Sequence, residues 1–441
     1  MRSLLIRVSF SSAMAALVLA ACSPSADPPS DATEHDGASP TDASAEGDIL
    51  GDGASSPSDG GALLEGGALN DASETNTGDA SAPIDGSISV PNPVVQLIGR
   101  YDSRDTNGPI FSWPGSRVFA RFTGSQVSVK LNETSGLTNE TDDYDVLIDG
   151  VAGAPLHTAK GTNDYTLATG LANGVHTVEI HKRTEAYVGK TQFLGFTFAG
   201  GALLDPPTTP IRRIEFIGDS QIDGFGVEGN GPVCAGWAPA STHNARKGFV
   251  GLVASDFDAY HAAITISGKG LLRNEDRADK TLFSSLYPLA NPFDTTSTWT
   301  PSDFAADLVV VVLGGTDYST DFSAPDAPPN DAAFQKAYSD FIAQVRAAQP
   351  TAYILLGVGA QIRDYNPPGY TYNARTKLTA ILNSVKMTRV TNGDSNVDVV
   401  IFPPAPDDAS QETGCAYHGN PTFHRAMADY IKPIIQTKLG W

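Results

Sequence analysis

The chain has 441 residues and a formal net charge of −21, which is enough length for two or three domains. The sequence contains no basic patch or stripe, so we expect no nucleic-acid partner. The acidic residues are unevenly spread: fourteen lie between Asp27 and Asp85.

Residues 1–21 have the features of a signal peptide rather than of a folded segment. "MRSLLIR" carries two arginines, and the apolar run that follows is too short for a stable membrane span. The stretch "LAAC", Leu19–Cys22, resembles the lipobox of bacterial lipoproteins, which implies lipidation at Cys22 and, because serine follows, an outer-membrane destination. We therefore expect an exported lipoprotein at the outer membrane or cell surface, or an extracellular protein. Plain secretion with cleavage after an alanine is the alternative.

Residues 22–92 are rich in Asp, Ala, Ser, Gly, Thr and Pro and contain no Lys or Arg. Such a segment cannot bury enough apolar surface to offset the loss of chain entropy, and its like charges repel one another. We expect a disordered acidic tether.

Residues 93–204 alternate apolar and polar side chains in short runs separated by turn residues. This pattern predicts an all-β sandwich of jelly-roll type. The clearest runs are "SRVFARFTG" (116–124), "SQVSVKLNE" (125–133), "DYDVLIDG" (143–150), "GVHTVEIHKR" (174–183) and "TQFLGFTFAG" (191–200).

After the linker "DPPTTP" (205–210), residues 211–441 alternate apolar strands with helices. Apolar side chains recur at helical spacing over 330–349, and a second helix is expected around 421–439. "DLVVVVLGG" (307–315) is continuously apolar, as in a strand covered on both faces. These residues predict a three-layer α/β/α domain with a mainly parallel sheet. In such domains the site lies beyond the carboxyl ends of the strands.

Ser220 follows one of these strands, in "EFIGDSQIDGFG" (215–226), and is a candidate nucleophile. A serine hydroxyl needs a base and donors for the resulting oxyanion. His418, in "GCAYHGNPTFH", is the candidate base, and a loop histidine without a catalytic role is the alternative. No cluster of residues has metal-ligand spacing, so we expect no metal.

Four blocks in this order resemble the consensus blocks of SGNH (GDSL) hydrolases, whose domain is flavodoxin-like: "GDS" (218–220), "SGKG" (267–270), "LGGTD" (313–317) and "YHGN" (417–420). The preceding segments "WPGSRVFARF", "VLIDG", "GLANGVHTVEIHKRTEA" and "FLGF" narrow this resemblance to the two-domain acetyl esterases of carbohydrate esterase family 2. The resemblance runs from about residue 95 to the C-terminus.

The resemblance implies that Ser220 is the nucleophile, that His418 is the base, and that the N–H groups of Ser220 and Gly268 stabilise the oxyanion. It also implies an acetyl-serine intermediate and no cofactor. Thr316 stands where the family has an asparagine that donates to the oxyanion. A threonine hydroxyl reaches less far, and the loss of one such donor can cost on the order of 10²–10³ in rate.

The superfamily places an aspartate three residues before the catalytic histidine, and here that position is Cys415. Some family members use a Ser–His dyad in which a backbone carbonyl holds the imidazole. Asp317, Asp407 and Asp408 are the remaining candidates for an orienting acid.

With Cys22 assigned to lipid, Cys234 and Cys415 remain in an exported, oxidising setting. We expect a disulfide between them, with two buried thiols as the alternative. Such a disulfide would hold the His418 loop in place of the missing acid.

The family resemblance implies acetylated xylan or mannan as the substrate. Trp237, Trp299 and Tyr318 are candidates for stacking on a sugar ring, and simple packing is the alternative for each. We expect a monomer. Two other functions are a polysaccharide-binding surface lipoprotein with little or no turnover, favoured by Thr316, and an esterase or lipase of broader scope.

Overall fold

The structure is a computed structural model, and it describes residues 94–441 except 208–210, 235–237, 319–325, 365–371 and 409. The predicted signal peptide, the tether, Cys22 and Trp237 lie outside the described residues. All of the described residues belong to one compact unit. The domain boundaries placed near 93, 204 and 211 stay predictions.

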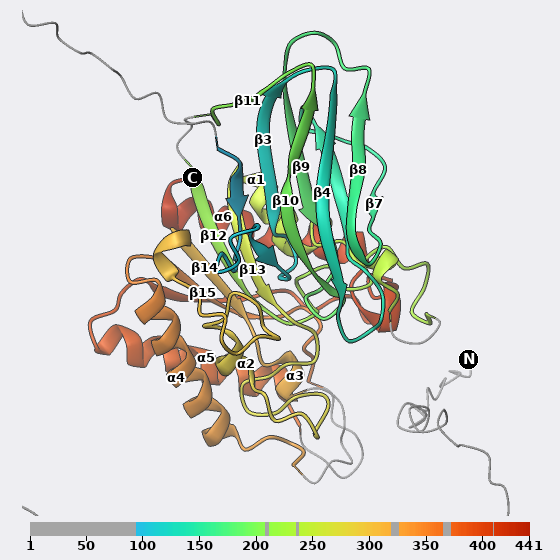
Figure 1. Cartoon of the computed structure of the whole chain (residues 1–441). Helices are drawn as coiled ribbons and strands as arrows, with labels where there is room; N and C mark the ends of the chain where they lie inside the picture. The colour runs from blue at the N-terminus through green and yellow to red at the C-terminus, as the bar shows by residue number, and fades with distance from the viewer. Residues whose placement is uncertain (1–93, 208–210, 235–237, 319–325, 365–371, 409) are drawn as a thin grey trace, which may run out of the picture. The chain divides into compact units, whose positions relative to one another are not determined.

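The first part of the described chain is a sandwich of two antiparallel sheets, and its long strands run alongside one another in Figure 1. Side chains in β3 alternate between buried and partly exposed positions, as predicted for a sheet with one face in the core. One sheet has the order β1 (Gln96–Ile98), β3 (Arg117–Thr123), β9 (Val175–Lys182), β5 (Asp143–Ile148), β6 (Val151–Ala152), with β11 (Leu203–Leu204) beside β3 and β7 (Leu156–His157) beside β5. The other has the order β2 (Ile110–Phe111), β10 (Gly189–Ala199), β4 (Gln126–Ser135), β8 (Gly161–Thr169).

The second part is built on a five-stranded sheet in which every neighbouring pair is parallel. All five side chains of its central strand are buried, as the continuous apolar run predicts. The strand order is β13 (Ala259–Thr265), β12 (Arg212–Gly218), β14 (Leu308–Val312), β15 (Tyr353–Val358), β16 (Val397–Ile401).

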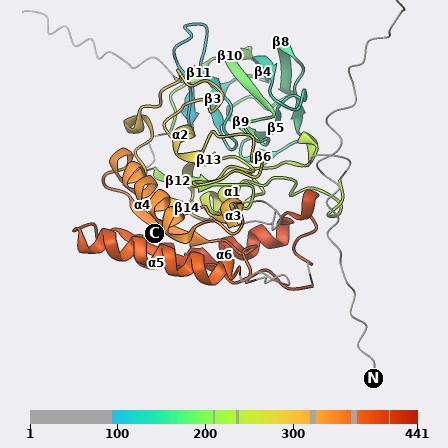
Figure 2. The same cartoon turned by 90° about the horizontal axis from the view of Figure 1, so that it is seen from below.

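Helices cover both faces of this sheet. On one face, α4 (Asp331–Ala348) and α5 (Ala374–Thr391) lie side by side and pack on the strands together with the short α2 (Phe283–Leu286). On the other face, α1 (Phe249–Asp256) packs with α6 (Pro421–Leu439) (Figures 1 and 2). The predicted jelly-roll sandwich followed by a three-layer α/β/α domain is therefore confirmed.

The two long helices expected from the sequence begin at side-chain caps. Asn330 precedes α4 and its side chain accepts a hydrogen bond from the N–H of Ala333. Asn420 precedes α6 and accepts from the N–H of Phe423. These bonds satisfy N–H groups that a helix start otherwise leaves without a partner. No helix among the described residues is long and apolar enough to cross a membrane.

The order β13-β12-β14 decides where the site forms. Each of these neighbouring parallel strands ends at the same edge of the sheet, and each is followed by one of the blocks noted in the sequence. Ser220 follows β12, Gly268 follows β13 and Thr316 follows β14 in the short α3 (Gly315–Tyr318). The three blocks therefore converge because of strand topology.

Candidate active site

Ser220 lies at a tight corner after β12. Gly218 ends the strand, and Ser220 is partly exposed while the residues on either side of it are buried. The corner then packs closely on the segment before α1: a Cβ at Gly224, whose φ is +86°, would lie 2.3 Å from the carbonyl oxygen of Asn244. Only glycine accommodates both this left-handed backbone and this approach.

Ser220 and His418 are in direct contact although 198 residues separate them in the sequence. The Nε2 atom of His418 lies 2.7 Å from the Oγ atom of Ser220. This distance is within the range expected for a nucleophile and its base. His418 belongs to the loop that follows the 3₁₀ turn η3 (Cys415–Tyr417).

Two backbone carbonyls orient the imidazole. The Nδ1 atom of His418 lies 3.0 Å from the carbonyl oxygen of Ala416 and 3.2 Å from that of Cys415. A carbonyl oxygen only accepts hydrogen bonds, so Nδ1 carries the proton and Nε2 presents a lone pair to Ser220. Ala416 and Tyr417 adopt positive φ angles of 54° and 61°, which turns this short segment back toward the ring. The surrounding protein desolvates the imidazole and lowers the pKa of His418 below its ordinary value of 6.5.

None of the three candidate orienting acids is hydrogen-bonded to His418. Asp317 is fully buried, and its carboxylate accepts hydrogen bonds from the backbone N–H groups of residues 271–273. Asp407 is fully exposed and Asp408 accepts from a nearby backbone N–H group in its own loop. Of the two alternatives that the sequence left open, the structure has the one in which backbone carbonyls hold the imidazole, and Asp317 instead stabilises the turn after Gly268.

The structure places the candidate oxyanion donors Gly268 and Thr316 in different surroundings. Gly268 has φ +72°, a left-handed conformation that favours glycine, and it lies in the loop after β13. The hydroxyl of Thr316 instead lies 3.1 Å from the carboxylate of Asp219, which also accepts from the Thr316 N–H at 3.3 Å. Burial raises the pKa of Asp219 to about 6, so at neutral pH the group is an acceptor. A hydroxyl has one proton, so Thr316 cannot donate to an oxyanion while it donates to Asp219.

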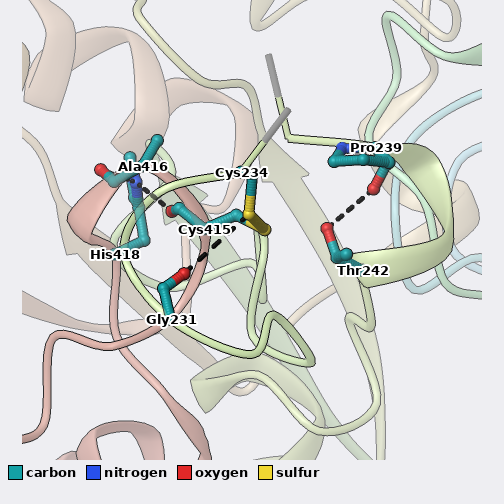
Figure 3. The surroundings of a disulfide bond; sticks show 7 residues. All are labelled: Gly231, Cys234, Pro239, Thr242, Cys415, Ala416 and His418. Carbon is teal, nitrogen blue, oxygen red and sulfur yellow. Dashed lines mark hydrogen bonds between the residues drawn. A yellow bond between two sulfur atoms is a disulfide. The ribbon is translucent and has the colours of Figure 1, made fainter. Parts of the chain in front are cut away.

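The predicted disulfide between Cys234 and Cys415 is present, with 5.3 Å between the two Cα atoms. Figure 3 shows it beside the turn that carries Ala416 and His418. The N–H of Cys415 also donates to the carbonyl oxygen of Gly226, in the loop that begins at Ser220, at 3.0 Å. The disulfide and this hydrogen bond therefore hold the histidine loop against the serine loop.

Two of the three candidate sugar-stacking residues are buried. Trp299 is 9% exposed and lies beneath the guanidinium of Arg100, while Tyr318 is 3% exposed and donates its hydroxyl to Asp331. Both side chains belong to the hydrophobic core, where burial of their apolar area contributes to stability. Trp237 lies outside the described residues.

Tyr417 is an exposed aromatic residue that the sequence analysis missed. Its side chain is 54% exposed, and it directly precedes His418 in the chain. The signal available in the sequence was the aromatic residue next to the candidate base in "YHGN". Among the described residues no group of three or more His, Cys, Asp or Glu side chains could hold a metal ion.

Comparisons with known proteins identify the family of each part of the chain. Residues 97–207 match the family described as carbohydrate esterase 2 N-terminal, and residues 216–426 match the GDSL-like lipase/acylhydrolase family. A solved family two carbohydrate esterase from Clostridium thermocellum, in complex with cellohexaose, is 31% identical with a TM-score of 0.70, and the match covers 79% of this chain and all of that one. The chain belongs to carbohydrate esterase family 2.

Two curated relatives extend this assignment within carbohydrate esterase family 2. The cellulase/esterase CelE of Acetivibrio thermocellus is 33% identical over 350 residues, which are 79% of this chain and 40% of CelE. An acetylxylan esterase/glucomannan deacetylase of Cellvibrio japonicus is 23% identical over 80% of this chain and 91% of its own length. The chain thus spans less than half of CelE. These relatives are carboxylic ester hydrolases, and the α/β/α domain has the SGNH hydrolase fold.

Proposed function

We propose that this family 2 chain is a serine esterase that removes O-acetyl groups from plant polysaccharides such as acetylated xylan or mannan. The observation that carries the proposal is the 2.7 Å contact between Ser220 Oγ and His418 Nε2 at the carboxyl edge of the parallel sheet. The names of the Cellvibrio japonicus relative and the cellohexaose-bound neighbour support a polysaccharide substrate.

Acylation begins with Ser220 and His418. The Nε2 atom of His418 takes the hydroxyl proton as Ser220 Oγ attacks the acetyl carbonyl carbon. The N–H groups of Ser220 and Gly268 donate to the oxyanion that forms. His418 then gives its proton to the departing sugar oxygen, which leaves an acetyl-serine.

In deacylation, water is the nucleophile and Ser220 is the leaving group. A water molecule loses its proton to His418 and attacks the acetyl carbon, and acetate leaves as Ser220 regains a proton. Throughout both steps the carbonyl groups of Cys415 and Ala416 keep the second ring nitrogen protonated. The base is therefore a dyad histidine held by backbone dipoles.

We also propose that the ring of Tyr417 contacts the sugar, because it is exposed and adjoins His418.

The chain would act as a monomer, with residues 93–204 as the sandwich domain and 211–441 as the catalytic domain. Lipid at Cys22 and the acidic tether 22–92 would hold both domains at the outer membrane or cell surface. Cys22→Ser should move the protein from the membrane fraction to the soluble fraction, and an unchanged distribution would argue against the anchor.

A second candidate function is polysaccharide binding without turnover. Thr316 supports it, because its hydroxyl is bound to Asp219 where the family has an oxyanion-donating asparagine. Only the two backbone donors, the N–H groups of Ser220 and Gly268, would then remain for the oxyanion.

One assay separates the candidates: acetate release from acetylated xylan, compared with hydrolysis of a long-chain nitrophenyl ester, for the wild type and Ser220→Ala. We expect acetate release that this substitution reduces by at least about 10³-fold, since the nucleophile is lost. Retention on acetylated xylan without acetate release would favour the binding protein, and preferred cleavage of the long-chain ester would favour a broader esterase.

A further inference from the structure

Glu185 links the sandwich to the loop that carries Gly268. It lies between β9 and β10, so it belongs to the sandwich part of the chain, and it is 1% exposed. One of its carboxylate oxygens accepts the backbone N–H of Ser267 at 3.0 Å, and the other accepts the Ser267 hydroxyl. A buried carboxylate with two donors from one residue holds that residue in a single orientation.

Ser267 immediately precedes Gly268, and the two share a peptide group. The backbone angles of Ser267 therefore decide where the N–H of Gly268 points. On the other side of the glycine, its carbonyl oxygen accepts the N–H of Glu275 at 2.9 Å. Hydrogen bonds thus restrain Gly268 on both sides. On the N–H side the restraint comes from Glu185, through Ser267.

The same carboxylate also faces the serine loop through Asp223. One oxygen of Asp223 accepts the N–H of Phe225 at 2.8 Å, while its buried Oδ2 receives no hydrogen bond from a described donor. Burial and the neighbouring Glu185 carboxylate raise the pKa of Asp223 well above its ordinary value. Burial raises the pKa of Glu185 as well, so the two carboxyl groups interact as a buried pair.

Glu185 is itself fixed within the sandwich. The fully buried ammonium of Lys182 donates to the carbonyl oxygen of Glu185 at 3.2 Å and to that of Thr184 at 2.9 Å. Its charge is balanced by Asp142 at 2.6 Å. The backbone at Glu185 therefore has little freedom, and its carboxylate has a fixed position relative to the serine loop and the 267–270 loop.

We propose that Glu185 is a positioning residue for the esterase reaction: it aligns the Gly268 N–H with the Ser220 corner so that both donors meet the same oxyanion. This inference rests on the proposed function. It makes the sandwich a part of the catalytic machinery, since the residue that sets the geometry of the oxyanion hole comes from outside the α/β domain.

Glu185→Ala should lower kcat for acetate release on the order of 10²-fold and leave KM within about threefold, because a misplaced donor weakens only the transition state. Glu185→Gln should recover at least about tenfold of this loss, because its amide can accept from the Ser267 N–H and donate to the Ser267 hydroxyl.

Glu215→Ala is the matched control. Glu215 is another fully buried carboxylate, and its partners Arg100, Tyr287 and Gln349 lie outside both the serine loop and the 267–270 loop. This variant should lose thermal stability but keep kcat at a temperature at which it is folded. Equal losses of kcat in the two alanine variants would reduce Glu185 to a structural residue and overturn the inference.

A folded Glu185→Ala variant with unchanged kcat would likewise overturn the inference while leaving the proposed function intact. If that variant does not fold, Ser267→Ala carries the test, since it removes only the hydroxyl donor. We expect about a tenfold loss of kcat there, and an unchanged kcat would refute the role. A wild-type chain that releases no acetate would instead overturn the proposed function, and the inference with it.

Discussion

At the scale of single residues, the unusual feature is a histidine oriented by neutral carbonyl groups. A carboxylate partner would stabilise the imidazolium form and raise the pKa of the ring. The carbonyl oxygens of Cys415 and Ala416 do so more weakly, and desolvation by the surrounding protein prevails, so the pKa of His418 lies below 6.5. The ring is neutral, and able to accept a proton, at ordinary pH.

This predicts the acid limb of the pH–rate profile. Because only neutral His418 acts as a base, kcat/KM should be full above the ordinary histidine pKa and fall only as pH drops through a midpoint below 6.5. A profile of acetate release between pH 4 and 9 measures it, and a midpoint above 7 would contradict the prediction. Burial raises the pKa of Asp219 to about 6, so this carboxyl group titrates in the same pH range as His418. Asp219→Asn is therefore the control that separates the two titrations.

At the scale of elements, the loop from Gly414 to Asn420 combines an unfavourable backbone with several restraints. Two successive non-glycine residues, Ala416 and Tyr417, are left-handed, at a cost of about 1–2 kcal/mol each. The loop is closed by a hydrogen bond from the Gly414 N–H to the His418 carbonyl oxygen at 3.0 Å, by the disulfide, and by the cap at Asn420. These restraints keep the turn in the conformation that aims two carbonyls at the histidine.

Loss of the disulfide should therefore affect both stability and rate. Cys234→Ala removes a link between residues 181 positions apart, and we expect a loss of about 2–5 kcal/mol in the free energy of unfolding. We also expect kcat to fall, because the histidine loop relaxes. Denaturant unfolding and acetate release measure the two effects, and wild-type protein treated with a reductant should behave like the variant. Unchanged stability and activity would count against this role.

At the scale of the whole described unit, the sandwich and the α/β part share one core. Ile98 and Trp113 from the sandwich pack in the same cluster as Ile217 and Ile264 from the parallel sheet. The guanidinium of Arg100, 1% exposed, lies 3.4 Å from the carboxylate of Glu215. Such a continuous interior favours one cooperative unit over two independent domains.

We therefore expect residues 94–441 to unfold in a single transition, seen identically by tryptophan fluorescence and far-UV circular dichroism. Arg100→Ala should lower the free energy of unfolding by about 3–5 kcal/mol, because it leaves the Glu215 carboxylate buried without its partner. Removal of both charges in Arg100→Ala/Glu215→Ala should cost less than the sum of the single changes. Two separate transitions in the wild type would show that the domains unfold independently.

Local patterns in the sequence determined the elements and marked Ser220 and His418 as candidate residues of the site. The valine run of β14 and the helical spacing of α4 reflect which side chains face the core, and that periodicity is written along the chain. Ser220 and His418 could be singled out because each follows a recognisable strand or precedes a capped helix. The topology of a parallel sheet then brings strand ends to one edge.

Only the tertiary structure decided how those residues are held. Local spacing does not reveal that the hydroxyl of Thr316 binds Asp219, that Trp299 and Tyr318 are buried, or that Glu185 reaches Ser267 across 82 positions. A hydrogen bond requires two atoms about 3 Å apart, and for residues distant in the chain that separation is set by how the sandwich and the parallel sheet pack. Periodicity specifies which face a side chain takes, whereas packing specifies which partner it meets.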